Sequence, residues 1–264
     1  MTSVTLTPTV LRVPHVPTTD PLISTGLGGW VGRGWGIVRR SHRPLLALAG
    51  GYALVGAVTG VTLNHLTATG AWAHPALALA PAVVLIATSP VSSFVQAASM
   101  YVAIRDAAGL HSTHREVARF AGERTWALLG WWLAAAALLI GGWLLLMAPG
   151  VYLAVVSGAA LTGVVVVERR GISRSLLLVA GRFWATTARA VLFGAGAAGY
   201  YAAVAWVSAA LLGARSDAAT VLTSLLTVPL GVAASAFLVA TYAELRYHEN
   251  RSTSTDRLAA ELTQ

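Results

Sequence analysis

The stretch that decides the fold is residues 44–104, which read PLLALAGGYALVGAVTGVTLNHLTATGAWAHPALALAPAVVLIATSPVSSFVQAASMYVAI. It contains no Asp, Glu, Lys or Arg, and it is long enough for two membrane-spanning helices of about 20 residues each. Further uncharged stretches lie between Arg124 and Glu168, between Arg189 and Arg215, and between Asp217 and Glu244. A water-soluble domain cannot bury so much uncharged chain, because its helices keep a polar face. The sequence therefore predicts a polytopic membrane protein.

Composition excludes several other classes of protein. Of the 264 residues, 56% are hydrophobic and 11% charged, whereas a globular domain has about 25% charged residues. Cysteine is absent, which removes disulfides, thiolate metal sites and iron–sulfur clusters. All basic residues are arginine, so no lysine is available for a Schiff base or a phosphate-binding loop. We expect no cofactor, no metal and no cleavable signal peptide.

The fold class that follows is all-α, a membrane bundle of about six spanning helices with amphipathic interfacial helices on the cytoplasmic side. A break between the third and fourth spans is expected at Pro149, which cannot continue a helix. The six predicted spans are 45–66, 76–100, 126–147, 150–167, 190–213 and 219–243.

The distribution of arginine predicts the orientation. Seventeen of the 18 basic residues lie in the N-terminal segment, in the loops between the second and third and between the fourth and fifth spans, and in the C-terminal tail. Only Arg215 lies on the other side. Positive charge is retained in the cytoplasm. We therefore expect an inner-membrane protein with both termini in the cytoplasm. Anionic lipids suit this basic face, and nucleic acid does not, because no separate basic module is present.

Proline content and charge also suggest domain boundaries. Four prolines and many threonines indicate a flexible leader over residues 1–29. The transmembrane domain is expected over 30–247, and a short polar cytoplasmic tail over 248–264.

Each pair of spans follows a basic stretch that contains arginine and tryptophan, at 32–44, 111–126 and 171–190. In the third, apolar residues recur at helical spacing. We interpret these stretches as amphipathic helices in the headgroup layer. They either form an ordinary aromatic belt or bind a specific lipid or a partner subunit. The candidate binding residues are Arg33, Trp35, Arg169, Arg170, Arg182 and Trp184.

The second span carries a polar face after Pro90. Ser89, Ser93 and Gln96, with Ser92 and Ser99, recur at spacings of three and four residues. This face either lines a channel or makes hydrogen bonds between helices. No ionisable side chain lies at membrane depth, which argues against proton-coupled transport.

Few residues could carry catalysis. Glu168 and Glu244 end the fourth and sixth spans beside Arg169, Arg170 and Arg246. Each glutamate forms a structural ion pair or acts as a general base at the membrane surface. The group His111-x-x-His114-x-Glu116 looks like a metal cluster, but it does not match the zinc-protease order, so we expect a solvated loop. The candidate catalytic residues are Glu168, Glu244, His111, His114 and Tyr152, with His42 and Tyr242 as further candidates.

Several runs resemble a known family. They are PGVYL (149–153), VVVVERRGISRSLLLVAGRFW (164–184), TYAELRYHEN (241–250) and RGWGIVRRSHRPLLAL (33–48). The chain is similar over most of residues 30–262 to the prokaryotic membrane domain named after glycerophosphoryl diester phosphodiesterase. The resemblance implies six spans and no phosphodiesterase activity, since hydrolysis in that family belongs to a separate soluble domain. Similar small membrane proteins also occur in the maturation of ribosomally made peptides.

Three functions remain open from the sequence. The first is a non-catalytic scaffold or accessory subunit that binds membrane lipids or another membrane subunit. The second is a membrane-embedded, cofactor-independent enzyme subunit that modifies a hydrophobic peptide, for example by epimerisation. The third is a permease or export component with the second span as its gate.

Overall fold

The structure is a computed structural model that describes residues 20–24, 26–68, 80–145, 147–214 and 216–263. Among these residues it is all-α and contains no strand, as predicted. Five helices are long and apolar enough to cross a membrane: Leu27–Ala68, His114–Leu144, Pro149–Glu168, Phe183–Leu212 and Asp217–Glu249. The second predicted span, 76–100, overlaps α2 (Ala80–Ala107), and its residues 76–79 lie outside the described residues.

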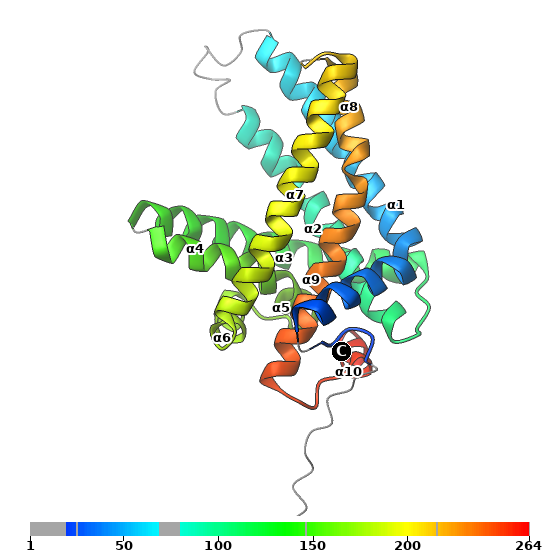
Figure 1. Ribbon diagram of the computed structural model, residues 1–264, viewed down its shortest axis with the longest axis vertical. Helices are drawn as coiled ribbons and strands as arrows, with labels where there is room; N and C mark the ends of the chain where they lie inside the picture. The colour runs from blue at the N-terminus through cyan, green and yellow to red at the C-terminus, as the bar shows by residue number, and fades with distance from the viewer. Residues whose placement is uncertain (1–19, 25, 69–79, 146, 215, 264) are drawn as a thin grey trace, which may run out of the picture.

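The first helix, α1 (Leu27–Ala68), has two parts of different direction (Figure 1). Ser41 has non-helical backbone angles, and Pro44 follows within the helix, so the helix bends where a proline cannot complete the hydrogen-bond ladder. The Ser41 hydroxyl donates to Asp106 at the end of α2 over 2.6 Å, which anchors the bend. The predicted interfacial stretch 32–44 therefore lies in the first part of α1 and in its bend, and we call the part before the bend, residues 27–40, the arm of α1.

A hairpin of α3 (His114–Leu145) and α4 (Met147–Val156) runs across the direction of α7 and α9 (Figure 1). Since α3 ends at Leu145 and α4 begins at Met147, the break lies just before the expected position, and Pro149 lies in the first turn of α4. The predicted interfacial stretch 111–126 is helical from His114, where it forms the first part of α3, continuous with the span.

The fourth spanning segment forms the centre of the molecule. It runs without a kink in backbone angles through α4, a π-helical turn η2 (Ser157–Leu161) and α5 (Thr162–Glu168), and most of it is buried. Gly163 allows α9 to approach closely, because a Cβ there would overlap the ring of Tyr242. The third amphipathic stretch forms α6 (Ile172–Ala180) and the start of α7 (Phe183–Leu212).

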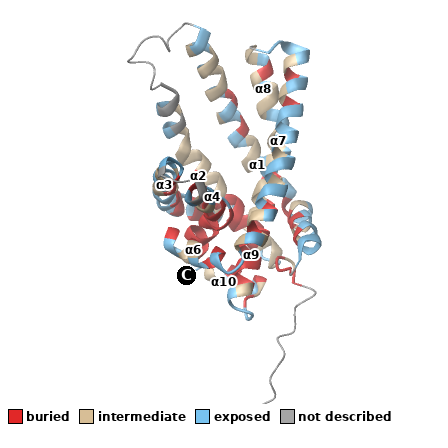
Figure 2. Cartoon of the chain, turned by 60° about the vertical axis from the view of Figure 1, so that its left-hand side comes forward, coloured by how far each residue is buried: buried red, intermediate tan, exposed pale blue. Residues whose placement is uncertain are grey.

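The last span is made of α8 (Asp217–Leu226) and α9 (Val228–Glu249), separated at Thr227 just before Pro229. Figure 2 shows that buried residues gather where α5, α6, α9 and α10 meet, while the far parts of α1, α7 and α8 are largely exposed or intermediate. We call the first region the basic end, defined by the ends of α5 and α9 together with α6 and α10. Exposed apolar side chains such as Leu54, Val58, Trp206 and Leu211 are the surface that lipid would cover.

Both described ends of the chain pack at the basic end, which differs from the expected leader and polar tail. Leu22 and Ile23 are buried, and α1 begins at Leu27, so of the expected leader only residues 1–19 and residue 25 lie outside the described residues. The tail folds into α10 (Thr255–Glu261), which is capped by Ser254 and buries Leu258. Two apolar residues and one short capped helix are each too short to give a periodic hydrophobic pattern. Neither element could therefore be predicted from the sequence.

Candidate functional site

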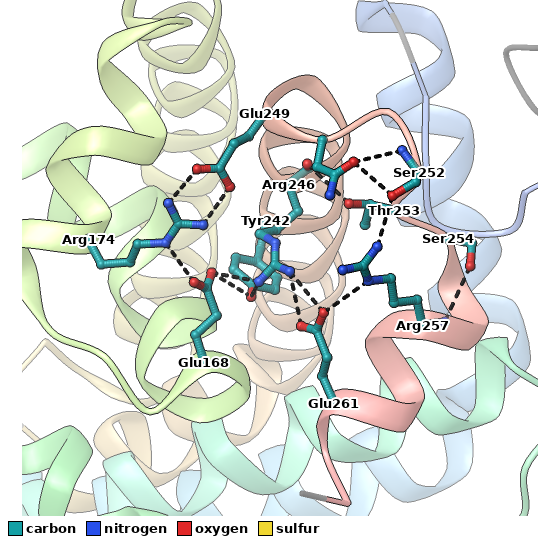
Figure 3. A network of polar contacts seen from close by, with 11 residues as sticks. Glu168, Arg174, Tyr242, Arg246, Glu249, Ser252, Thr253, Ser254, Arg257 and Glu261 are labelled. Atoms are coloured by element: carbon teal, nitrogen blue, oxygen red, sulfur yellow. Dashed lines mark hydrogen bonds and ion pairs between the residues drawn. The ribbon is translucent and has the colours of Figure 1, made fainter. Parts of the chain in front are cut away.

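The carboxylate of Glu168 lies at the centre of a polar network at the basic end (Figure 3). Arg174 Nε lies 2.6 Å from Oε2, and Arg246 Nη1 lies 2.8 Å from Oε1. The Tyr242 hydroxyl donates to Oε1 over 3.1 Å. The Glu168 side chain is only 9% exposed. A buried carboxylate needs such partners, because removing a charge from water costs several kcal/mol.

A tight turn after α5 creates this arrangement. Arg169 adopts left-handed backbone angles (φ 55°), and its N–H donates to the carbonyl of Val164. The chain then reverses through Gly171, where a Cβ would overlap the ring of Trp131. The turn directs Arg169 and Arg170 to the exposed surface and returns Arg174 to Glu168.

The network extends from Glu168 across α6, α9 and α10. Arg174 also binds Glu249 through both terminal nitrogens. The hydrogen bond to Glu249, together with that to Glu168, raises the pKa of Arg174 above its ordinary value despite partial burial. Arg246 bridges to Glu261 over 3.0 Å. Four helices are thereby joined through alternating charges, as Figure 3 shows.

Glu244 holds a second buried cluster. Arg189 of α7 lies 2.6 Å from its Oε1, and the Ser24 hydroxyl donates to Oε2 over 3.2 Å. His248, one turn later on α9, lies 3.4 Å from the same carboxylate. Arg182 lies 2.8 Å from the ring of His248.

Asp20 connects the two ends of the described chain. Its Oδ1 accepts hydrogen bonds from the backbone N–H groups of Leu22 and Ile23 and from the Thr255 hydroxyl, the last at 2.6 Å. Its Oδ2 accepts from the Thr255 N–H over 3.0 Å. One carboxylate thus forms a turn in residues 20–23 and fixes the start of α10.

The predicted catalytic residues do not converge on one centre. Glu168 and Glu244 are each paired with arginine inside packed helices. Tyr152 packs its ring against Phe183 at 5.0 Å between centroids, and the tyrosine that reaches Glu168 is Tyr242.

The histidines lie elsewhere. His111 and His114 line a separate cavity of about 390 Å³ with Asp106, where α1, α2 and α3 meet. Glu116 accepts a hydrogen bond from the Thr113 N–H over 2.9 Å, and its own N–H donates to the Thr113 hydroxyl. This reciprocal capping box starts α3, and the pattern Thr-x-x-Glu was a readable signal for it. No group of three His, Cys, Asp or Glu suited to a metal occurs in the described part of the chain.

The predicted lipid-binding residues fall into two groups. Trp35, Arg169, Arg170 and Trp184 are exposed, with Trp184 80% exposed. Arg33 donates to the carbonyl of Ile23, and Arg182 contacts His248. The apolar stripe of α6 differs from the expectation: Ile172 and Val179 are buried in the protein, and Leu177 is the side chain directed outward.

The polar face of the second span lines a cavity of about 480 Å³ between α1, α2, α9 and η2. Gln96 is fixed there, because Thr162 donates to its Oε1 over 2.9 Å and its Nε2 donates to Ser92 over 3.3 Å. Ser92 and Ser99 also line the cavity, while Ser93 is buried and neither Ser93 nor Ser89 is among the lining residues.

Sequence reasoning missed Asp20, Arg189 and Glu249. The spacing of Glu244 and His248, four residues apart on one helix, was a local signal for the contact between these two side chains.

Comparison of the chain with models of protein families, with curated proteins and with solved structures finds no match. The resemblance to the glycerophosphoryl diester phosphodiesterase membrane domain therefore stays a prediction, and the site is interpreted from its geometry alone.

Proposed function

We propose that this protein is a non-catalytic scaffold of the inner membrane, with both termini in the cytoplasm and the basic end facing anionic lipid headgroups. One observation carries the proposal. The four glutamates of the basic end, Glu168, Glu244, Glu249 and Glu261, are paired with arginines within the protein, while other arginines stay exposed. Internal neutralisation of these glutamates leaves this surface positive.

Four arginines supply that positive surface: two lie just after α5, one lies on the arm of α1 and one in its bend. The arm is hydrogen-bonded to Pro21 and Ile23 at the basic end. Arg39, Arg43, Arg169 and Arg170 are exposed, and none of them has a side-chain hydrogen bond or ion pair among the described residues. An arginine close to an anionic membrane surface contributes about 1 kcal/mol of attraction.

A row of exposed apolar residues leads to one of these arginines, Arg39. Leu27, Val31 and Trp35 follow one another at four-residue spacing along the arm of α1, are 51%, 43% and 60% exposed, and lead on to Arg39. The opposite face of the arm is buried through Trp30, whose Nε1 donates to Thr241. An arm fixed to the protein on one face, with tryptophan and arginine on the other, suits the boundary between headgroups and acyl chains.

The enzyme alternative has less support. Glu168 and Glu244 line neither the 480 Å³ nor the 390 Å³ cavity, and the candidate histidines lie apart from them. The permease alternative is supported only by the polar lining of the larger cavity.

Thermal unfolding in a neutral detergent tests the proposal. Phosphatidylglycerol should raise the unfolding temperature more than phosphatidylcholine does, because a ligand that binds the folded state stabilises it. The variant Arg39→Gln/Arg43→Gln/Arg169→Gln/Arg170→Gln should lose this difference. Arg215→Gln, the arginine that the sequence assigns to the opposite side, is the matched control and should retain it.

Equal responses of the wild type to both lipids would contradict the proposal. A partner subunit as the true occupant would instead be indicated by stoichiometric co-purification of one membrane protein that the fourfold variant loses.

A further inference from the structure

The cavity of about 480 Å³ lies within the spanning helices, away from the basic end. Its walls come from α1, α2, α3, η2, α5, α8 and α9. We propose that it binds an uncharged amphiphile from the bilayer that carries a hydrogen-bond acceptor, of the acylglycerol type. This site is independent of the proposed binding of anionic lipids.

The hydrogen-bonding groups are held in place before any ligand arrives. The amide of Gln96 has one N–H engaged by Ser92 and its oxygen engaged by Thr162. The second N–H has no partner among the described residues, and neither has the buried Nε1–H of Trp132, which also lines the cavity. A polar group withdrawn from water without a partner costs free energy. Since the remaining N–H of Gln96 only donates, the ligand must offer an acceptor.

The π-helical turn contributes to this geometry. It ends just before Thr162, and it brings Gly158 and Thr162 to the same cavity wall. Single π turns within helices occur frequently at functional sites.

The ligand is uncharged because none of the lining residues is Asp, Glu, Lys, Arg or His. A charged headgroup would lose its water without gaining a counter-ion. The remaining walls are largely apolar, with Val95, Met100, Leu238 and Val239 among them. A hydrocarbon chain therefore fits beside the polar groups.

The route of entry points to the bilayer. Tyr52, Gly56, Gly158 and Gly231 line the cavity and are exposed positions of the helices that surround it, so the cavity is open between these helices. Lipid rather than water surrounds these positions, so the occupant enters sideways.

Photolabelling of the full chain in nanodiscs tests the proposal. The probe is 1-oleoylglycerol with a diazirine in its acyl chain, and the comparison probe is diazirine oleate at a pH where it is anionic. In the wild type, the neutral probe should label residues of the cavity at least fivefold more than the anionic probe. Unlabelled 1-oleoylglycerol should compete, and unlabelled oleate should not.

Two kinds of variant locate the site. Gly56→Leu and Gly158→Leu fill the cavity without a clash at Cβ, since the only atom within 4 Å is the Ser224 oxygen at 4.0 Å from Gly56. Both should reduce labelling at least fivefold. Gly194→Leu on α7, also free of neighbours within 4 Å but not among the lining residues, should leave it unchanged. Gln96→Leu should reduce labelling by the acylglycerol probe about fivefold to tenfold. Labelling by a diazirine alkane, which makes no hydrogen bond, should not change.

Equal labelling by the anionic probe, labelling outside the cavity, or a cavity that takes up only water would overturn the proposal. The wild-type competition decides the matter even if a variant fails to fold.

Discussion

Arg189 of α7 and Glu244 of α9 form an ion pair of 2.6 Å in which the two side chains are 8% and 2% exposed. The guanidinium also lies over the ring of Trp30, 5.9 Å from its centroid. Three elements that are far apart in the sequence, the arm of α1, α7 and α9, therefore meet at one buried charge pair.

We expect Arg189→Met to lower the free energy of unfolding by about 3–5 kcal/mol, because it leaves the carboxylate of Glu244 buried without its cation. Denaturant titration in a mild detergent measures the change. The double variant Arg189→Met/Glu244→Met should recover most of the loss, because two apolar side chains leave no buried charge. A double variant as unstable as the single one would show that packing, and not charge, is what matters here.

The close approach of α5 and α9 can be tested at Gly163. A methyl group in Gly163→Ala would meet the ring of Tyr242, and we expect a loss of about 1–3 kcal/mol from the resulting strain. Gly158→Ala in the same spanning segment is the matched control, because a Cβ there meets nothing within 4 Å. Equal unfolding midpoints for the two variants would disprove the close packing.

Asp20→Ala should release residues 20–24 and the start of α10 from each other. The loss of four hydrogen bonds to a buried carboxylate should cost about 1–3 kcal/mol. Hydrogen exchange should rise at Thr255 and Leu258, while the centre of α5 stays protected. Asp256→Ala, at an exposed position of the same helix, should change exchange little, and a similar effect of both variants would count against the contact.

The absence of cysteine allows a clean test of orientation. Ser173→Cys on α6 and Ala214→Cys at the other end of α7 are both at exposed positions. A membrane-impermeant maleimide should label Ala214→Cys in intact cells, and it should label Ser173→Cys only after the membrane is permeabilised. The reverse pattern would invert the proposed topology.

The spans were readable from the sequence because hydrophobic length is a local property. The break just before Pro149 and the bend near Pro44 follow from the chemistry of proline, which is also local. The crosswise direction of the α3–α4 hairpin was not readable, because it depends on how distant helices pack.

The ion pairs were predicted with the wrong partners. Arg246 was expected beside Glu244, but residues two apart on a helix point in different directions, and Arg246 instead pairs with Glu168. Arg169 and Arg170 were expected beside Glu168, but they lie beyond the left-handed end of α5. Closeness in the sequence did not predict the ion-pair partners, because ion pairs between helices depend on how the helices pack.

Contact between Asp20 and Thr255 joins positions 235 residues apart. Residues 20–24 leave the ribosome before any spanning helix is made, and α10 is made only after α9. The N-terminal segment must therefore wait through the insertion of every span before it can close, so that final ordering of this end of the molecule is a late step of biogenesis.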